Sequence, residues 1–145
     1  MKIGISACLM GYKYRYDGTH RKNEELLDIL KGHELIPVCP ELCSGFSVPH
    51  DPIELKGDRA YLKDGSDVTD KLIKGCDLSL EKIKDCDLVI LKTKSPSCGY
   101  KKIYDGSFSG KLIDGNGMFA RSCLENNIRV FSENDLNSIR EYTAQ

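Results

Sequence analysis

The sequence lacks the features that would place the protein in a membrane or on a polyanion. No apolar run approaches the roughly 20 residues of a membrane-spanning helix, and the chain starts with a strand pattern rather than a targeting segment. With 21 basic and 22 acidic side chains, the formal net charge is −1, so no excess of positive charge is available to hold a nucleic acid. We expect a cytoplasmic protein that binds no membrane and forms no stable complex with nucleic acid, and its oligomeric state is unknown.

The sequence also lacks the paired cysteines that are typical of structural zinc sites. Of its seven cysteines, none forms a CxxC pair, and the nearest approach is Cys39 with Cys43. An odd number of cysteines without an export signal also disfavours a disulfide framework. The thiols are therefore expected to be reduced or to bind a metal.

The pattern of apolar residues predicts alternating strands and helices. The predicted strands are short, apolar and rich in β-branched residues: 2–6, 35–38, 87–93 and 128–131. The predicted helices carry apolar residues at helical spacing: 24–31 capped by Asn23, from Ser66 or Asp67 to about 84, 118–126, and a short last helix capped by Ser132 or Asn134. A hairpin is expected at 53–62. A glycine-rich loop is expected to follow Gly99 and to run to Gly117.

This order predicts an α/β fold. At 145 residues with 40% hydrophobic side chains, the chain suits one domain better than two. We expect a single three-layer domain over residues 1–145, with a mainly parallel sheet, helices on both faces and a small hairpin insertion. The strand 87–93 is the most hydrophobic and should lie centrally in the sheet.

Three cysteines, Cys8, Cys39 and Cys98, each follow a predicted strand. In a parallel sheet the carboxyl ends of the strands meet at one edge, where ligands bind. Three thiolates there would suit a cuboidal iron-sulfur cluster whose fourth iron stays open to a small ligand, whereas a structural zinc site is closed by four ligands. Cys43 is either a spare loop thiol or an auxiliary ligand. The remaining cysteines are predicted to pack as small apolar side chains: Cys76, Cys86 and Cys123.

Polar residues accompany these cysteines in the same loops. Glu41 lies two residues after Cys39. It would act as a general base or proton relay, or else it is an exposed loop carboxylate. Ser95 and Ser97 precede Cys98, and their hydroxyls would bind a substrate or cap a turn. Residues 13–22 are basic and aromatic; contact with a base or phosphate is one interpretation, and a solvated loop is the favoured one.

Several separated motifs resemble those of one bacterial family. In chain order they are Ser6-Ala7-Cys8-Leu9, Arg15-Tyr16-Asp17-Gly18, Val38-Cys39-Pro40-Glu41, Ser95-Pro96-Ser97-Cys98-Gly99 and Tyr104-Asp105-Gly106-Ser107-Phe108-Ser109-Gly110, with Gly45, Pro49 and Glu54 between them. The sequence, from about residue 3 to 133, resembles the bacterial thiouracil desulfidase family. It departs from the family pattern at His50, where an arginine is usual, and at Cys43, where cysteine is not general.

The resemblance implies an iron-sulfur-dependent desulfidase. By this likeness Cys8, Cys39 and Cys98 would hold a [4Fe-4S] cluster, which aerobic preparation can remove or replace, while Glu41 and Ser95 would assist catalysis. The implied substrate is a small thiolated nucleobase such as thiouracil. Its thiocarbonyl sulfur is soft and would bind the open iron, water activated by the glutamate would attack the carbon, a proton would pass through the serine, and sulfide would be released.

The predicted substrate-binding residues are Ser97, Asp17 and His50. Two other functions remain open on the sequence alone. One is a zinc-binding structural or regulatory module with four cysteine ligands: Cys8, Cys39, Cys43 and Cys98. The other is a cluster-free cysteine redox protein in which one thiol of low pKa reacts. No histidine lies within the three cysteine motifs, which weighs against the latter.

Overall fold

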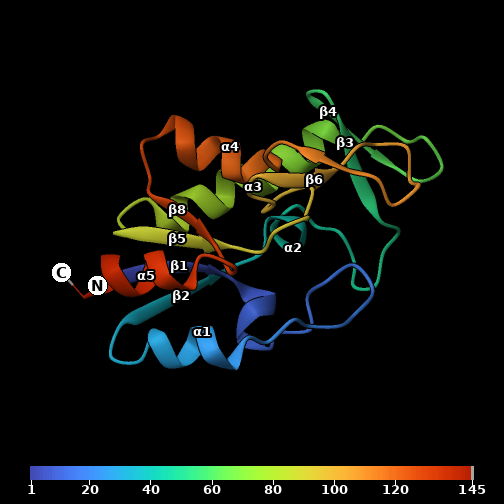
Figure 1. Ribbon diagram of the computed structural model, residues 1–145. Helices are drawn as coiled ribbons and strands as arrows, with labels where there is room; N and C mark the ends of the chain where they lie inside the picture. Colours follow the sequence, from blue (N-terminus) through green and yellow to red (C-terminus); the bar gives the residue numbers. More distant parts are fainter. Residues whose placement is uncertain (145) are drawn as a thin grey trace.

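A four-stranded parallel sheet forms the centre of the fold in the computed structural model, which describes residues 1–144 (Figure 1). The strands lie in the order β2 (Glu34–Val38), β1 (Lys2–Ser6), β5 (Leu88–Leu91) and β8 (Val130–Ser132). Every neighbouring pair is parallel. The predicted mainly parallel sheet is therefore confirmed, and the apolar strand β5 is internal, as expected.

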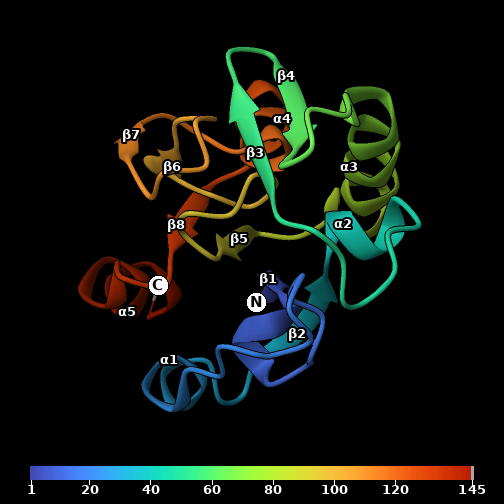
Figure 2. The same cartoon turned by 90° about the vertical axis from the view of Figure 1, so that its right-hand side faces the viewer.

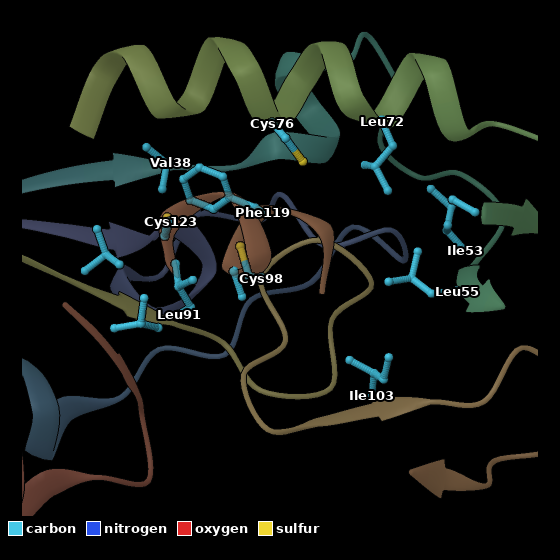
Figure 3. Packing of buried hydrophobic residues seen from close by; sticks show 14 of the residues in the cluster. Val38, Ile53, Leu55, Leu72, Cys76, Leu91, Cys98, Ile103, Phe119 and Cys123 are labelled. Atoms are coloured by element: carbon cyan, nitrogen blue, oxygen red, sulfur yellow. The ribbon is translucent and has the colours of Figure 1, made fainter. Parts of the chain in front are cut away.

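Helices cover both faces of this sheet (Figures 1 and 2). On one face lie α1 (Glu24–Ile29) and α5 (Leu136–Thr143), and on the other lie α3 (Thr69–Ile83) and α4 (Met118–Glu125). Side chains along a strand alternate between faces, so Leu88 and Ile90 of β5 join the first apolar cluster, and Val89 and Leu91 join the second. Figure 3 shows the second cluster, which includes Cys98. Within residues 1–144, no helix has the length and apolar character to cross a bilayer.

The helix ends follow the predicted caps in part. Asn23 caps α1, because its side-chain oxygen accepts a hydrogen bond from the Leu26 amide at 3.0 Å. Helix α3 begins later than predicted, because the Asp67 side chain accepts from the Thr69 amide at 2.9 Å in a turn that precedes the helix. The predicted caps of α5 are wrong: Asp135 occupies the N-cap position, and Ser132 is the last residue of β8.

Two hairpins lie beyond the sheet. The predicted one consists of β3 (Ile53–Lys56) and β4 (Arg59–Leu62), with its turn at residues 57–58 as expected. The second pairs β6 (Lys102–Tyr104) with β7 (Leu112–Asp114), where a loop was predicted. Strands of three residues are too short to show an alternating pattern. The short helices η1 (Ala7–Met10) and α2 (Pro40–Cys43) were not predicted either, because four residues are too few to show helical spacing.

Gly75 permits the close approach of α2 to α3. The Ser44 hydroxyl, directly after α2, donates a hydrogen bond to the Pro40 carbonyl at 2.8 Å. A Cβ atom at Gly75 would lie 1.9 Å from the Ser44 Oγ and 2.1 Å from the Pro40 carbonyl oxygen, distances that real atoms do not adopt. The position of α2, and of the residues on it, therefore depends on a glycine in the middle of α3.

Replacing Gly75 by alanine is expected to lower the free energy of unfolding. Alanine is the better helix former by ~1 kcal/mol, but the overlap with a backbone oxygen forces α2 to move, and overpacking of this kind costs about 1–3 kcal/mol or more. We expect a net loss of about 2 kcal/mol in urea unfolding. The exposed neighbour Lys74, replaced by alanine, is the control and should change stability by less than about 0.5 kcal/mol. A Gly75→Ala protein as stable as the wild type would contradict this packing.

Candidate active site

A cavity of about 490 Å³ opens at the carboxyl edge of the sheet. Segments that follow β1, β2 and β5 form its floor, and the loop after η1 and the β6–β7 hairpin add further walls. This is the edge at which parallel α/β sheets bind ligands. The topology therefore brings together residues that are far apart in the sequence, such as Cys8 and Cys98, which are 90 positions apart.

The three predicted ligand cysteines line this cavity from three separate segments. Cys8 lies in η1, Cys39 is the N-cap residue of α2, and Cys98 follows β5. In the described part of the chain, no three His, Cys, Asp or Glu side chains are close enough to hold one metal ion. Three cysteine thiolates can hold an iron-sulfur cluster, and the three cysteines that line this cavity supply that donor set.

Burial keeps these thiols protonated when no metal is bound. It raises the pKa of the Cys8 thiol to about 11, although Lys92 and Arg15 lower that pKa in part. It raises the pKa of the Cys39 thiol to about 12, and the pKa of Cys98, which is buried, lies well above its ordinary value. Ligand thiols are deprotonated when a metal binds. A site of one buried and two half-buried thiols therefore suits a cationic metal centre that replaces their protons.

Glu41 places a carboxyl group in the same cavity. It lies in the first turn of α2, after Pro40, and is half-buried. Burial raises the pKa of the Glu41 carboxyl to about 7, and the nearby Arg15 guanidinium lowers that pKa only in part. Carboxyl groups with a pKa near neutrality suit general acid and base catalysis. The structure thus disagrees with the alternative of an exposed loop carboxylate.

Ser95 lines the cavity and also caps the turn that carries Cys98. Its Oγ accepts hydrogen bonds from the amides of Ser97 at 3.2 Å and Cys98 at 3.0 Å. A hydroxyl has two acceptor positions and one donor, so its O–H remains for donation, either to the Ser97 Oγ at 3.1 Å or to a ligand. Ser95 therefore caps a turn and also lines the cavity, so the structure agrees with both uses that the sequence left open.

The start of α4 fixes the Cys98 loop from behind. The amides of Met118 and Phe119 donate to the carbonyls of Pro96 and Ser97 at 2.9 and 2.8 Å. Gly117 packs so closely that a Cβ atom there would lie 2.5 Å from the Ser97 carbonyl oxygen. These contacts hold the backbone around Cys98 in one conformation.

A buried ion pair beside the cavity was missed by the sequence analysis. Lys92 lines the cavity, and its Nζ lies 3.2 Å from Glu133, whose carboxyl also accepts a hydrogen bond from the Thr93 amide at 2.8 Å. One signal in the sequence could have indicated it: Lys92 directly follows the apolar residues Leu88–Leu91. The predicted strand 87–93 included this lysine, so its side chain was not considered for the site.

The basic and aromatic loop is largely exposed to solvent and also contributes to the cavity wall. Tyr14, Arg15, Tyr16 and Arg21 all line the cavity. The Cys39 thiol donates to the Tyr14 carbonyl at 4.0 Å, which ties this loop to the start of α2. Residues 13–22 thus form a largely solvated loop, as favoured, and four of its side chains also line the cavity.

The comparisons with known proteins agree with one another. Residues 3–135 match the family described as 2-thiouracil desulfurase. The chain belongs to this family. It is 37% identical over 149 residues to the uncharacterized protein YbbK of Bacillus subtilis (strain 168), in a match that covers 94% of this chain and 99% of that protein. The family resemblance predicted from the motifs is thus confirmed.

A solved structure supports the same assignment. The chain is similar to the [4Fe-4S]-dependent thiouracil desulfidase TudS, with a TM-score of 0.92 and 34% sequence identity. The match covers 99% of this chain and 97% of that one. The predicted α/β fold class is therefore confirmed by a related structure as well as by the sheet itself.

Two residues that depart from the pattern of the desulfurase family stand outside the described cavity wall. Cys43 lies at the end of α2, where its sulfur is 3.6 Å from the Lys82 Nζ on α3. His50 packs against Phe46, with 5.1 Å between ring centroids, and its amide donates to the Tyr16 carbonyl at 2.7 Å. Neither residue lines the cavity.

Of the predicted substrate-binding residues in this desulfurase-family chain, Ser97 lines the cavity. Asp17 and His50 are not part of the wall formed by residues 1–144. The Asp17 side chain instead accepts a hydrogen bond from the Thr19 amide at 3.1 Å, within its own loop. Both residues contact the loop that carries Arg15 and Tyr16: Asp17 lies 3.9 Å from the Arg15 guanidinium, and the His50 amide donates to the Tyr16 carbonyl.

Proposed function

We propose that this protein is a [4Fe-4S]-dependent desulfidase that removes sulfur from a thiolated nucleobase such as thiouracil. The observation that carries the proposal is the meeting of Cys8, Cys39 and Cys98 in one cavity with Glu41 and Ser95. Membership of the 2-thiouracil desulfurase family supports it. So does the structural likeness to TudS, which is a [4Fe-4S]-dependent thiouracil desulfidase.

Cys8, Cys39 and Cys98 would hold the cluster. When bound with three protein ligands, a [4Fe-4S] cluster supplies an iron with an open position, where a soft thiocarbonyl sulfur binds well. The protein supplies the cavity wall around the thiols, with a carboxyl group and a hydroxyl group in the same wall. We propose that these two groups move the protons of the reaction.

Glu41 would take a proton from the water that attacks the thiocarbonyl carbon. With a pKa near 7, its carboxyl group is deprotonated in a large share of molecules at neutral pH and still basic enough to accept a proton. Ser95 would hold a proton at the ring nitrogen, because its oxygen already accepts two backbone hydrogen bonds and its O–H is left to donate. The balance is one thiocarbonyl and one water giving one carbonyl and one hydrogen sulfide.

The charge of the cavity favours an anionic group on the substrate. Its wall contains five basic side chains, although the whole chain has a formal net charge of −1: Arg15, Arg21, Lys63, Lys92 and Lys94. Two acidic residues line it, Glu41 and Glu54. A cavity of about 490 Å³ also has more room than a single pyrimidine ring fills. We therefore include thiolated nucleotides in the proposed substrate class.

Anaerobically reconstituted protein is expected to convert 2-thiouracil to uracil and to release one sulfide per uracil. Iron and acid-labile sulfide are quantified first, and then uracil by chromatography and hydrogen sulfide by a colorimetric assay. We expect kcat/KM to be higher for thiouridine 5′-monophosphate than for the free base, and this advantage to shrink at high salt because screening weakens its phosphate contacts. Protein loaded with four irons that forms no uracil or uridylate from either compound contradicts the proposed function.

A further inference from the structure

Phe108 lines the cavity from the loop between β6 and β7. Its φ angle is 57°, in the left-handed region that bulky residues rarely adopt. Such a conformation costs free energy and persists only where surrounding contacts enforce it. The backbone preference of phenylalanine therefore does not explain the position of Phe108 in the cavity wall.

Glu54 is the residue that enforces this conformation. It is buried in β3, 9% exposed, and its Oε1 accepts hydrogen bonds from the amides of Gly106 at 3.0 Å and Phe108 at 3.1 Å. The loop also packs tightly on β3, since a Cβ atom at Gly106 would lie 2.8 Å from the Leu55 carbonyl oxygen. Through these two hydrogen bonds, Glu54 holds the β6–β7 loop against the first hairpin.

The ring of Phe108 stacks on no other ring within residues 1–144. The aromatic residues on the other side of the wall are already engaged. Tyr14 stacks on Tyr12, with 5.2 Å between centroids, and Tyr16 has the Arg15 guanidinium 5.7 Å from its ring. Phe108 has no polar group to bind a ligand in any other way. Its half-buried ring therefore offers an apolar face to whatever enters the cavity.

We propose that Phe108 stacks on the planar ring of the substrate and that Glu54 is the positioning residue that holds it there. The inference rests on the function proposed above and adds a binding residue to it. Stacking on an aromatic side chain stabilises any planar base, because every base has a π face. It binds the substrate and the transition state alike, and so it lowers KM and leaves kcat almost unchanged.

Kinetics separate this role from a structural one. Phe108→Leu should raise KM for 2-thiouracil by about 10-fold, a typical loss for one stacked base, with kcat changed less than about 3-fold. Phe108→Tyr keeps the ring and should restore KM. Glu54→Leu should raise KM as Phe108→Leu does, whereas Glu54→Gln retains the accepting oxygen and should stay close to wild type. A Phe108→Leu protein with unchanged KM overturns the proposal.

Fluorescence tests the stacking without catalysis. The chain contains no tryptophan, so Phe108→Trp introduces a single reporter, and Tyr142→Trp on α5 is the control outside the cavity wall. Uracil is titrated into metal-free and reconstituted protein, at concentrations where equilibrium dialysis detects binding. Saturable quenching in Phe108→Trp alone supports stacking even if the protein desulfurises nothing, in which case the proposed function fails separately. Bound uracil without a change in Phe108→Trp emission overturns the proposal.

Discussion

Cys98→Ala protein is expected to bind no stable cluster and to release sulfide no faster than heat-treated protein. Cys98 is buried in the loop that Ser95 caps and α4 supports, and these contacts fix its place in the cavity wall. Its loss leaves two thiolates for the proposed cluster, which is too few to hold it and keep one iron open. Iron content, the visible absorption spectrum and sulfide release after anaerobic reconstitution measure the effect, and Cys8→Ala and Cys39→Ala should behave alike.

Cys43→Ala is the matched control. Cys43 is also a half-buried cysteine of α2, but its sulfur lies beside Lys82 and outside the cavity wall. It should load four irons and retain wild-type activity. Loss of metal from Cys43→Ala would instead favour the zinc module with four cysteine ligands. Activity that depends on a single cysteine, with the other two silent, would favour a cluster-free thiol protein.

The sheet and its helices were predictable because their signals are local. The residues of β5 are continuously apolar, as expected for a strand covered on both faces. Asn23 followed by two glutamates marks the start of α1 in the sequence itself. The β6–β7 hairpin carries no such signal: β7 is exposed along its whole length, and each strand has three residues. Its position depends on contacts such as that of Glu54 with Phe108, 54 residues apart.

The same distinction divides the candidate site. Cys8, Cys39 and Cys98 were singled out because each follows a strand, and the edge of a parallel sheet brings strand ends together whatever their separation in sequence. Lys92 and Glu133 were not, because their pairing depends on how β5 and β8 lie side by side. The charged residues of one motif also differ in position. The Asp17 side chain accepts a hydrogen bond within its own loop, while Arg15, two residues earlier, lines the cavity.

Burial makes the site dependent on its cofactor. Three thiols whose pKa values all lie above their ordinary range are neutral in the metal-free protein. Neutral thiols add no negative charge to the cavity, whose wall holds more basic than acidic side chains, although Glu133 pairs with Lys92. Loading a metal centre therefore changes the electrostatics of the cavity along with its chemistry.

Replacing Glu41 by glutamine is expected to lower kcat by about 10²–10⁴-fold, the usual contribution of a general base. Glutamine keeps the size of the side chain and its place in the first turn of α2, but it cannot accept a proton from water. Cluster content and the affinity for uracil should stay unchanged, because Cys39 and the other residues of the cavity wall are untouched. Single-turnover assays with quantified clusters measure the chemical step without product release.

Two further glutamate variants decide between a base and a merely structural carboxyl group. Glu41→Asp retains a carboxylate on a shorter side chain and should recover part of the lost rate, which a packing role would not allow. Glu125→Gln, at the exposed end of α4, makes the same chemical change outside the cavity wall and should leave kcat unchanged. If Glu41→Gln turns over within threefold of wild type, another group activates the water. Ser95 is then the remaining candidate, because its O–H is the other proton-carrying group assigned to the reaction.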